Sequence, residues 1–166
     1  NLRHNSIKFL AKNSFDNLDL NLISLHLDFN KIKYLNGSLR LLNSLKDLNL
    51  SNNLIEVLNQ TREFSGLVNL RTLDLSGNLL KILNILNSFF KFESLRTLDL
   101  SNNPNLKIAN CSLFFNKPFT TLLLRNSSNE ILESVEFEKL SKLDVIDLSF
   151  NNFSYLKQKI LLNNSA

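Results

Sequence analysis

Asparagines in Asn-x-Ser/Thr sequons are the residues whose spacing most directly suggests a chemical modification of this chain. The side-chain amide in such a triplet is the acceptor for N-linked glycans. Asn36 and Asn59 each lie nine residues after a recurring leucine, and Asn110 lies ten residues after one. This shared register predicts glycans on one flank of the molecule. The candidate glycosylation sites are Asn36, Asn59, Asn110, Asn126, Asn152 and Asn163.

Residues for catalysis or metal binding do not form a recognisable set. His4 and His26 have no Cys or His at metal-ligand spacing. The single cysteine, Cys111, excludes an internal disulfide and a cysteine-built metal site. Neither a Ser-His-Asp combination nor a glycine-rich phosphate loop can be assembled. The sequence therefore predicts a protein that is not an enzyme and needs no cofactor or metal.

A repeat of about two dozen residues runs through the whole chain and must position any functional side chain. The pattern L-x-x-L-x-L-x-x-N-x-L recurs, with a partial copy at the start and a degenerate copy around Phe119. Its equivalent leucines are Leu2, Leu27, Leu50, Leu75, Leu100, Leu124 and Leu148. Their separations of 25, 23, 25, 25, 24 and 24 residues predict about seven stacked repeats.

Each column of the repeat has a physical meaning. Side chains alternate in a strand, so the leucines of L-x-L point inward and the residue between them points outward. The asparagine column follows the strand, where a buried amide can bond the backbone groups that a turn leaves unpaired. A second column, 13–14 residues after the strand leucine, predicts a phenylalanine-rich seam behind the strands; it comprises Phe15, Phe64, Phe89, Phe114 and Phe137.

These residues resemble a known family. The phrases Leu73-Asp74-Leu75-Ser76-Gly77-Asn78 and Leu98-Asp99-Leu100-Ser101-Asn102-Asn103 are similar to animal extracellular leucine-rich repeats, most of all to Toll-like receptor ectodomains. The resemblance covers essentially all of residues 1–166. It implies an α/β solenoid: a leucine-rich-repeat horseshoe with a parallel concave β-sheet and a mostly irregular convex side.

The ends of the chain depart from that family. Extracellular repeat arrays are normally closed by cysteine-rich caps, and neither end carries one. Both termini fall inside repeats, and terminal repeats normally need a polar outer face. We therefore expect an interior portion of a longer chain, or a partner at each end.

Candidate ligand-binding residues are those where the repeated phrase is broken. The middle repeats carry the same Asp-x-Ser phrase at their outward-facing positions, so we expect these repeats to be framework. Near the start and toward the end, other side chains replace it, and the fifth repeat is irregular near Ser127. Irregular repeats often carry binding loops. We expect ligand recognition at His26, Asp28, Phe29, Leu123, Arg125 and Glu130, and receptor dimerisation is a further role expected of the last three.

Composition narrows the class of partner. The net charge is +4, but the lysines and arginines are scattered singly, so a nucleic-acid ligand is not favoured, although it stays open. The apolar stretches are too short to span a membrane. The predicted function is non-catalytic recognition of a protein or other macromolecule by an extracellular or cell-surface ectodomain, as in innate immune pattern recognition. A secreted or adhesive matrix or developmental protein and an intracellular repeat scaffold are the alternatives.

Overall fold

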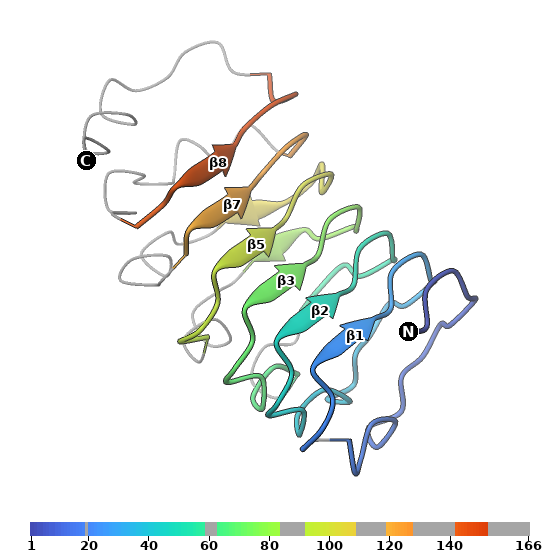
Figure 1. Cartoon of the computed structure of the whole chain (residues 1–166). Coiled ribbons are helices and arrows are strands. Elements are labelled where there is room, and N and C mark those ends of the chain that lie inside the picture. Colours follow the sequence, from blue (N-terminus) through green and yellow to red (C-terminus); the bar gives the residue numbers. More distant parts are fainter. Residues whose placement is uncertain (19, 59–62, 84–91, 109–118, 128–141, 153–166) are drawn as a thin grey trace.

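The computed structural model winds as a solenoid in which most turns contribute one short strand to a parallel sheet (Figure 1). It describes residues 1–166 except 19, 59–62, 84–91, 109–118, 128–141 and 153–166. Six strands form one sheet in the order β1-β2-β3-β5-β7-β8, and β4 and β6 form a second sheet behind it. The strands are β1 (Ser24–His26), β2 (Asp47–Asn49), β3 (Thr72–Asp74), β4 (Ile82–Leu83), β5 (Thr97–Asp99), β6 (Lys107–Ile108), β7 (Thr121–Leu123) and β8 (Val145–Asp147).

The register of the sheet follows the sequence repeat. The central residue of every strand pairs with the central residue of the next; these are Leu25, Leu48, Leu73, Leu98, Leu122 and Ile146. The second leucine of the repeat comes directly after each strand and continues the ladder. Leu27 donates its N–H to the carbonyl of Asn49 and Leu50 donates to Asp74, both over 2.9 Å. The predicted parallel solenoid is therefore confirmed.

The partial repeat at the start of the chain also joins the sheet. The N–H of Leu2 donates to the carbonyl of His26 over 2.8 Å, and that of His4 donates to Asp28 over 3.1 Å. This segment has the hydrogen bonds of a rung without the full geometry of a strand. The partial copy of the repeat at the start of the chain is thus hydrogen-bonded to the first full repeat.

Leucines fill the space behind the sheet. Leu27, Leu50, Leu75 and Leu100 are completely buried, and removing such side chains from water is the main stabilising term of a stacked repeat. The phenylalanine seam is partly visible. Phe15 and Phe64 are buried in it as predicted. Phe89, Phe114 and Phe137 lie outside the described residues.

The asparagine column forms the predicted ladder of buried amides. Nδ2 of Asn78 donates to the carbonyls of Leu50 and Leu75, and its Oδ1 accepts from the N–H of Ile55, all over 3.0 Å. Each amide thus ties its own turn to the turn before it. Asn5 is exposed and donates only within its own rung. The asparagines that bond across rungs are Asn30, Asn53, Asn78, Asn103 and Asn151.

The residue directly before each position of this column has a left-handed backbone. Its φ is positive in His4, Phe29, Asn52, Gly77, Asn102, Asn126 and Phe150. Glycine and asparagine accept this conformation readily, whereas a bulky side chain costs roughly 1–2 kcal/mol there. The middle repeats therefore use the residues that suit the turn, and the strain falls on Phe29 and Phe150 near the two ends.

The back of the solenoid is irregular in the part that the structure describes. Turns and bends connect the strands there, and no described residue is helical. This agrees with the predicted irregular convex side. Among the described residues, no helix has the length and apolar character that crossing a bilayer requires.

Candidate functional site

The exposed face of the six-stranded sheet has two columns of outward-facing side chains, one on each side of the buried leucines, and all are polar except Leu123 and Val145. The column predicted from the repeat lies after them; it comprises His26, Asn49, Asp74, Asp99, Leu123 and Asp147. A second column lies before them and was missed. The two-residue alternation of a strand, extended one step toward its start, would have found it. This column comprises Ser24, Asp47, Thr72, Thr97, Thr121 and Val145.

A row of cations borders the start of the central strands. Lys46, Arg71 and Arg96 directly precede β2, β3 and β5. The N–H of Arg71 donates to the carbonyl of Lys46 over 2.7 Å, and that of Arg96 donates to Arg71 over 2.8 Å. Neighbouring strands lie about 4.8 Å apart, so the three positive side chains stand side by side. They occupy the same position of the repeat, 25 residues apart in sequence, although this column was not among the predicted site residues.

A pair of carboxylates lies at the opposite end of the same strands. Asp74 and Asp99 are directly opposite each other in adjacent strands. Each accepts a 2.9 Å hydrogen bond from the N–H of the serine two residues later, Ser76 or Ser101. Burial raises the pKa of Asp99, and the carboxylates of Asp74 and Asp147 add to this, while the bonds from Ser101 oppose it.

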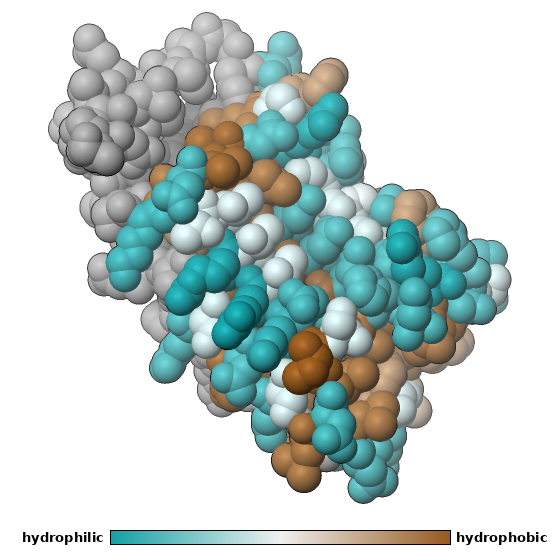
Figure 2. Space-filling view, in the orientation of Figure 1, coloured by the Kyte–Doolittle hydropathy of each residue, from teal (hydrophilic) through white to brown (hydrophobic). Residues whose placement is uncertain are grey.

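These two groups make the face of the sheet electrically dipolar. The cation row and the acidic pair are three residues apart along each strand, which is roughly 10 Å. Figure 2 shows hydrophilic surface over the middle of the sheet and a hydrophobic patch over β7 and β8. Leu123 of β7 is half-buried, and Val145 of β8 is 49% exposed. The face therefore changes from charged to apolar along the solenoid.

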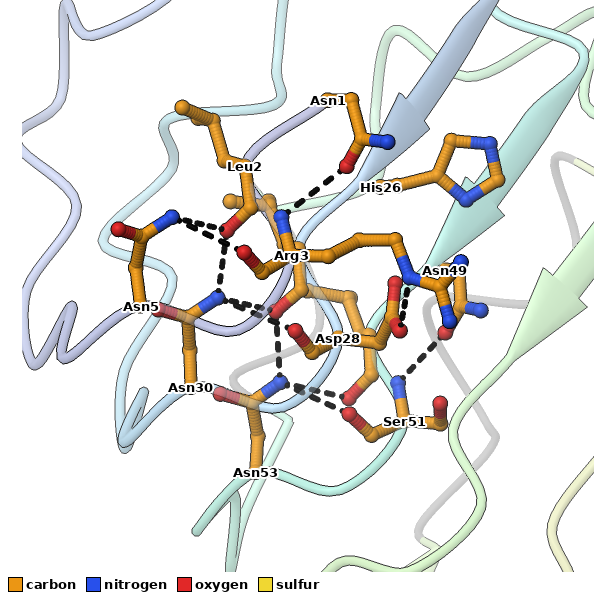
Figure 3. A network of polar contacts seen from close by, with 12 residues as sticks. Asn1, Leu2, Arg3, Asn5, His26, Asp28, Asn30, Asn49, Ser51 and Asn53 are labelled. Atoms are coloured by element: carbon orange, nitrogen blue, oxygen red, sulfur yellow. Dashed lines mark hydrogen bonds and ion pairs between the residues drawn. The ribbon is translucent and has the colours of Figure 1, made fainter.

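The N-terminal end of the sheet contains a network of polar contacts (Figure 3). Nε of Arg3 donates to Oδ2 of Asp28 over 2.7 Å, and Nε2 of His26 lies 3.1 Å from the hydroxyl of Ser24. Nδ1 of His26 and Oδ1 of Asp28 are buried without a hydrogen-bond partner in the structure. Two of the predicted ligand-binding residues, His26 and Asp28, thus lie two residues apart at this end of the sheet, each with its own partner.

Asp28, one of the predicted ligand-binding residues, is buried. Its side chain is 1% exposed, because the first rung of the chain lies over it and carries Arg3 across it. A ligand at this end would therefore meet Arg3 before it met Asp28. Arg3 was not among the predicted ligand-binding residues, and its partner lies 25 residues away in sequence.

Phe29 is exposed and belongs to a second contact at the same end. Its ring stacks on that of His4, with centroids 4.4 Å apart and an interplanar angle of 11°. Both residues have a left-handed backbone. A stacked, half-exposed aromatic pair on a strained turn is a feature that binding sites often show.

The other predicted residues lie at the far end of the sheet. The guanidinium of Arg125 sits over the ring of Phe150, 4.4 Å from its centroid, and Phe150 is 73% exposed. Leu123 is the last residue of β7, and Arg125 follows two residues after the end of that strand. Glu130 lies outside the described residues. Three strands separate this end from the His26 end, so the predicted residues form two groups and not one site.

The predicted glycosylation sites are partly visible. Asn36, Asn126 and Asn152 are exposed. Asn59, Asn110 and Asn163 lie outside the described residues, so the flank that they share is not placed. A further triplet, Asn49-Leu50-Ser51, also matches the sequon and lies on the sheet, where Oδ1 of Asn49 accepts from the N–H of Ser51.

The described residues contain no cluster of three or more His, Cys, Asp or Glu side chains that could hold a metal ion. The ionisable groups on the sheet are arranged in rows and do not converge on a point. This arrangement suits contact with an extended surface better than attack on a single bond.

Comparisons with known proteins agree with this geometry. A family model described as leucine rich repeat matches residues 21–80 and 60–105. No curated protein matches the chain in sequence. Among solved structures, an internalin from Listeria monocytogenes is similar, with a TM-score of 0.66 and 24% identity. The match covers 87% of this chain and 39% of the internalin chain, so this chain spans well under half the length of that protein.

Proposed function

Because the chain belongs to the leucine-rich repeat family, we propose that it is a non-catalytic recognition module whose sheet face binds a protein partner. The observation that carries the proposal is the dipolar face. Arg71 and Arg96 form its basic side and Asp74 and Asp99 form its acidic side. A partner with the opposite arrangement of charges would be aligned in one orientation, since complementary charges set register and orientation more than affinity.

The geometry of the face supports a protein partner. Seven rungs at about 4.8 Å give a row roughly 30 Å long, which is enough for one side of a standard protein interface. The apolar patch around Leu123 and Val145 would supply the buried part of the contact, and Arg125 its polar rim. Such a division between apolar centre and polar rim is typical of protein interfaces.

The acidic pair is better suited to recognition than to catalysis. The carboxylates of Asp74 and Asp99 already accept bonds from the serines that follow them. Their positions are fixed by the turn that each strand enters. This leaves them as oriented charges on a rigid surface, which favours binding without reorganisation.

We further propose that the module is part of an extracellular or cell-surface ectodomain of the Toll-like type, acting in innate immune recognition. The support is the Leu-x-Leu-Ser phrasing of the middle repeats together with exposed sequons at Asn36, Asn126 and Asn152. Receptor dimerisation through the end that carries Leu123 and Arg125 belongs to the same proposal.

Site-specific photo-crosslinking tests the recognition surface. A crosslinking amino acid at position 71 lies on the dipolar face, whereas one at Leu41 lies in the exposed turn between β1 and β2 and is the control. Adducts identified by mass spectrometry should form from position 71 and not from position 41. Equal labelling from both positions would refute the proposed surface.

Charge reversal with the identified partner then tests the mechanism. We expect Arg71→Glu with Arg96→Glu to weaken binding about tenfold or more, since like charges opposed at an interface cost several kcal/mol. Leu41→Ala should leave the affinity unchanged. An unchanged affinity in the charge-reversed variant would show that the dipolar face is not the contact.

Secretion from eukaryotic cells tests the proposed location. Enzymatic removal of N-glycans should increase the mobility of the secreted protein, and Asn36→Gln should remove one step of that shift. A protein that enters the secretory pathway and carries no glycan at any sequon would contradict the extracellular proposal.

A further inference from the structure

Asn36 and Gly37 form the one Asn-Gly pair in the sequence, and they lie in a tight turn between β1 and β2. The N–H of Ser38 donates to the carbonyl of Leu35 over 2.9 Å and closes a four-residue turn. Its two central residues both have a positive φ, 52° at Asn36 and 69° at Gly37. A hydrogen-bonded turn of this kind is of type I′, for which Asn-Gly is a preferred sequence. The backbone conformation therefore explains why this pair occurs here.

An Asn-Gly pair can also react with itself. The backbone nitrogen of Gly37 attacks Cγ of the Asn36 carboxamide, the Cγ–Nδ2 bond breaks, and ammonia leaves with the proton of that nitrogen. The product is a five-membered succinimide ring. Water then adds to one of the two ring carbonyls and opens the ring to aspartate or isoaspartate. The whole reaction consumes one water and releases one ammonia, and it needs no enzyme, oxidant or metal.

The turn leaves both reacting groups open. Asn36 is exposed, so water reaches its carboxamide. The N–H of Gly37 makes no hydrogen bond within the part of the chain that the structure describes, so its nitrogen is free to attack. A Cβ added to Gly37 would meet no heavy atom within 4 Å, apart from the residues next to it in the chain. The succinimide ring therefore has room to form without displacing a packed side chain.

Asn126 shows what the pair would lack without its glycine. Asn126 is also exposed and also has a positive φ, of 47°. Its successor is Ser127, whose Cβ shields the backbone nitrogen as glycine does not. The N–H of Ser127 also donates to Oδ1 of Asn151 over 2.8 Å. The same backbone region thus holds one asparagine beside a free nitrogen and another beside a shielded, hydrogen-bonded one.

Glycosylation is the competing modification of the same side chain, because Asn36, Gly37 and Ser38 also form a sequon. A sugar on Nδ2 prevents the loss of ammonia. In the folded turn Ser38 is only 3% exposed, and its hydroxyl, which belongs to the acceptor motif, is buried. A glycan would therefore have to be added before the turn folds. A chain that folds without the glycan keeps the reactive pair.

We propose that Asn36 is a deamidation site, which a glycan added before folding protects and which otherwise converts to aspartate or isoaspartate in the folded protein. Nδ2 of Asn36 donates to the carbonyl of Leu10 over 3.1 Å. The product carries a carboxylate there and loses this bond between two adjacent turns. The modification goes beyond the recognition proposed for the sheet face and does not depend on it.

Peptide mapping of the folded, unglycosylated chain from bacteria tests the proposal. During incubation in mildly alkaline buffer, the Asn36 peptide should gain one mass unit and separate into two forms, aspartate and isoaspartate. Its rate should exceed that of Asn126 in the same sample by about tenfold or more, because only Asn36 precedes a glycine. A parallel sample in urea gives the rate of the unfolded chain. The proposal is overturned if Asn36 reacts in urea and stays unchanged in the folded protein.

Two variants separate the chemistry of the pair from the sequon. Gly37→Ala adds a Cβ beside the attacking nitrogen and should slow the reaction of Asn36 about tenfold, while Asn126 keeps its rate. Urea unfolding shows that the variant is folded. Ser38→Ala destroys the sequon and keeps the Asn-Gly pair, so it is the matched control and should react at the natural rate.

Protein secreted from eukaryotic cells tests the protection by the glycan. The glycopeptide that contains Asn36 should keep its mass during the same incubation, whereas the corresponding peptide of Ser38→Ala should deamidate. Equal rates in the natural chain and in Gly37→Ala would overturn the proposal, and so would Asn126 reacting as fast as Asn36. Deamidation of Ser38→Ala that is as slow as in the natural glycosylated chain would overturn the protective role of the glycan.

Discussion

Arg3 and Asp28 form an ion pair between two adjacent turns of the solenoid, with Nε donating to Oδ2 over 2.7 Å. The two side chains differ greatly in exposure: that of Arg3 is 46% exposed and that of Asp28 is 1% exposed. Other repeats place a small serine where Asp28 stands, as at Ser51 and Ser101. The buried carboxylate therefore depends on the rung above it for its charge partner.

Loss of Arg3 should destabilise the protein through Asp28. We expect Arg3→Ala to lower the free energy of unfolding by about 2–3 kcal/mol, because it leaves a buried carboxylate without a counter-charge. In an Asp28→Ser background the same change should cost little. A double-mutant cycle measured by urea unfolding tests this. Equal losses in the two backgrounds would show that the pair is not coupled.

The amide ladder should contribute most to the stability of the fold in the middle of the chain, where its asparagines are buried. Asn78→Ala removes the partners of the N–H of Ile55 and of the carbonyls of Leu50 and Leu75. We expect a loss of about 3 kcal/mol, since buried backbone groups left unpaired each cost about 1–3 kcal/mol. Asn5→Ala is the control from the same column, where exposure should keep the loss below about 1 kcal/mol. Similar losses at both positions would contradict a role for burial.

Alanine substitutions at two glycines distinguish the stability cost of steric overlap from the stability cost of backbone strain. A Cβ on Gly66 would lie 2.1 Å from the carbonyl oxygen of Arg40, so Gly66→Ala must push two turns apart. We expect a loss of about 3 kcal/mol from this overpacking. Gly37 has a φ of +69° but open space around it, so Gly37→Ala should cost only about 1–2 kcal/mol. Thermal or urea unfolding that ranks Gly37→Ala as the worse variant would contradict this account.

The raised pKa of Asp99 makes stability depend on pH. Burial is the main cause, so the folded protein holds the Asp99 proton more tightly than the unfolded chain does. Stability contributed by this group is present at low pH and falls as pH rises from the ordinary pKa through the raised one. Asp99→Asn keeps an acceptor for Ser101 without the charge. It should be more stable than the natural chain at about pH 7, with the difference shrinking toward about pH 3.

Urea unfolding of both proteins across that range measures the effect. Asp147→Asn is the contrasting variant, because hydrogen bonds from Ser149 lower the pKa of Asp147. Its stability relative to the natural chain should change in the opposite sense, with a loss at neutral pH. If Asp99→Asn were the less stable protein at neutral pH, burial would not be the controlling cause.

The repeat itself was open to prediction from the sequence because its rules are local. Alternation along a strand sets which leucines point inward, and the period sets which leucines become neighbours. That was enough for the parallel sheet, for the buried Phe64 and for the amide ladder through Asn78. The bonds of the ladder need only that successive turns stack in register.

The candidate site was harder to predict because the burial and the charge partners of a side chain depend on the adjacent turn of the solenoid. Asp28 sits in an outward-facing column, yet the first rung covers it and brings Arg3 to it. The same stacking gathers Arg71 with Arg96 on the sheet. Each of these partners is about two dozen residues away in the chain, beyond the reach of any local pattern.

The sequence by itself determined the period, the inward leucines and the turn asparagines, because these follow from backbone geometry within one repeat. Only the tertiary structure decided which charges act together. Stacking in the sheet brings each strand residue within about 5 Å of its counterpart in the adjacent repeat. Stacking likewise brings Phe9 beside Tyr34, although they are 25 residues apart in the sequence.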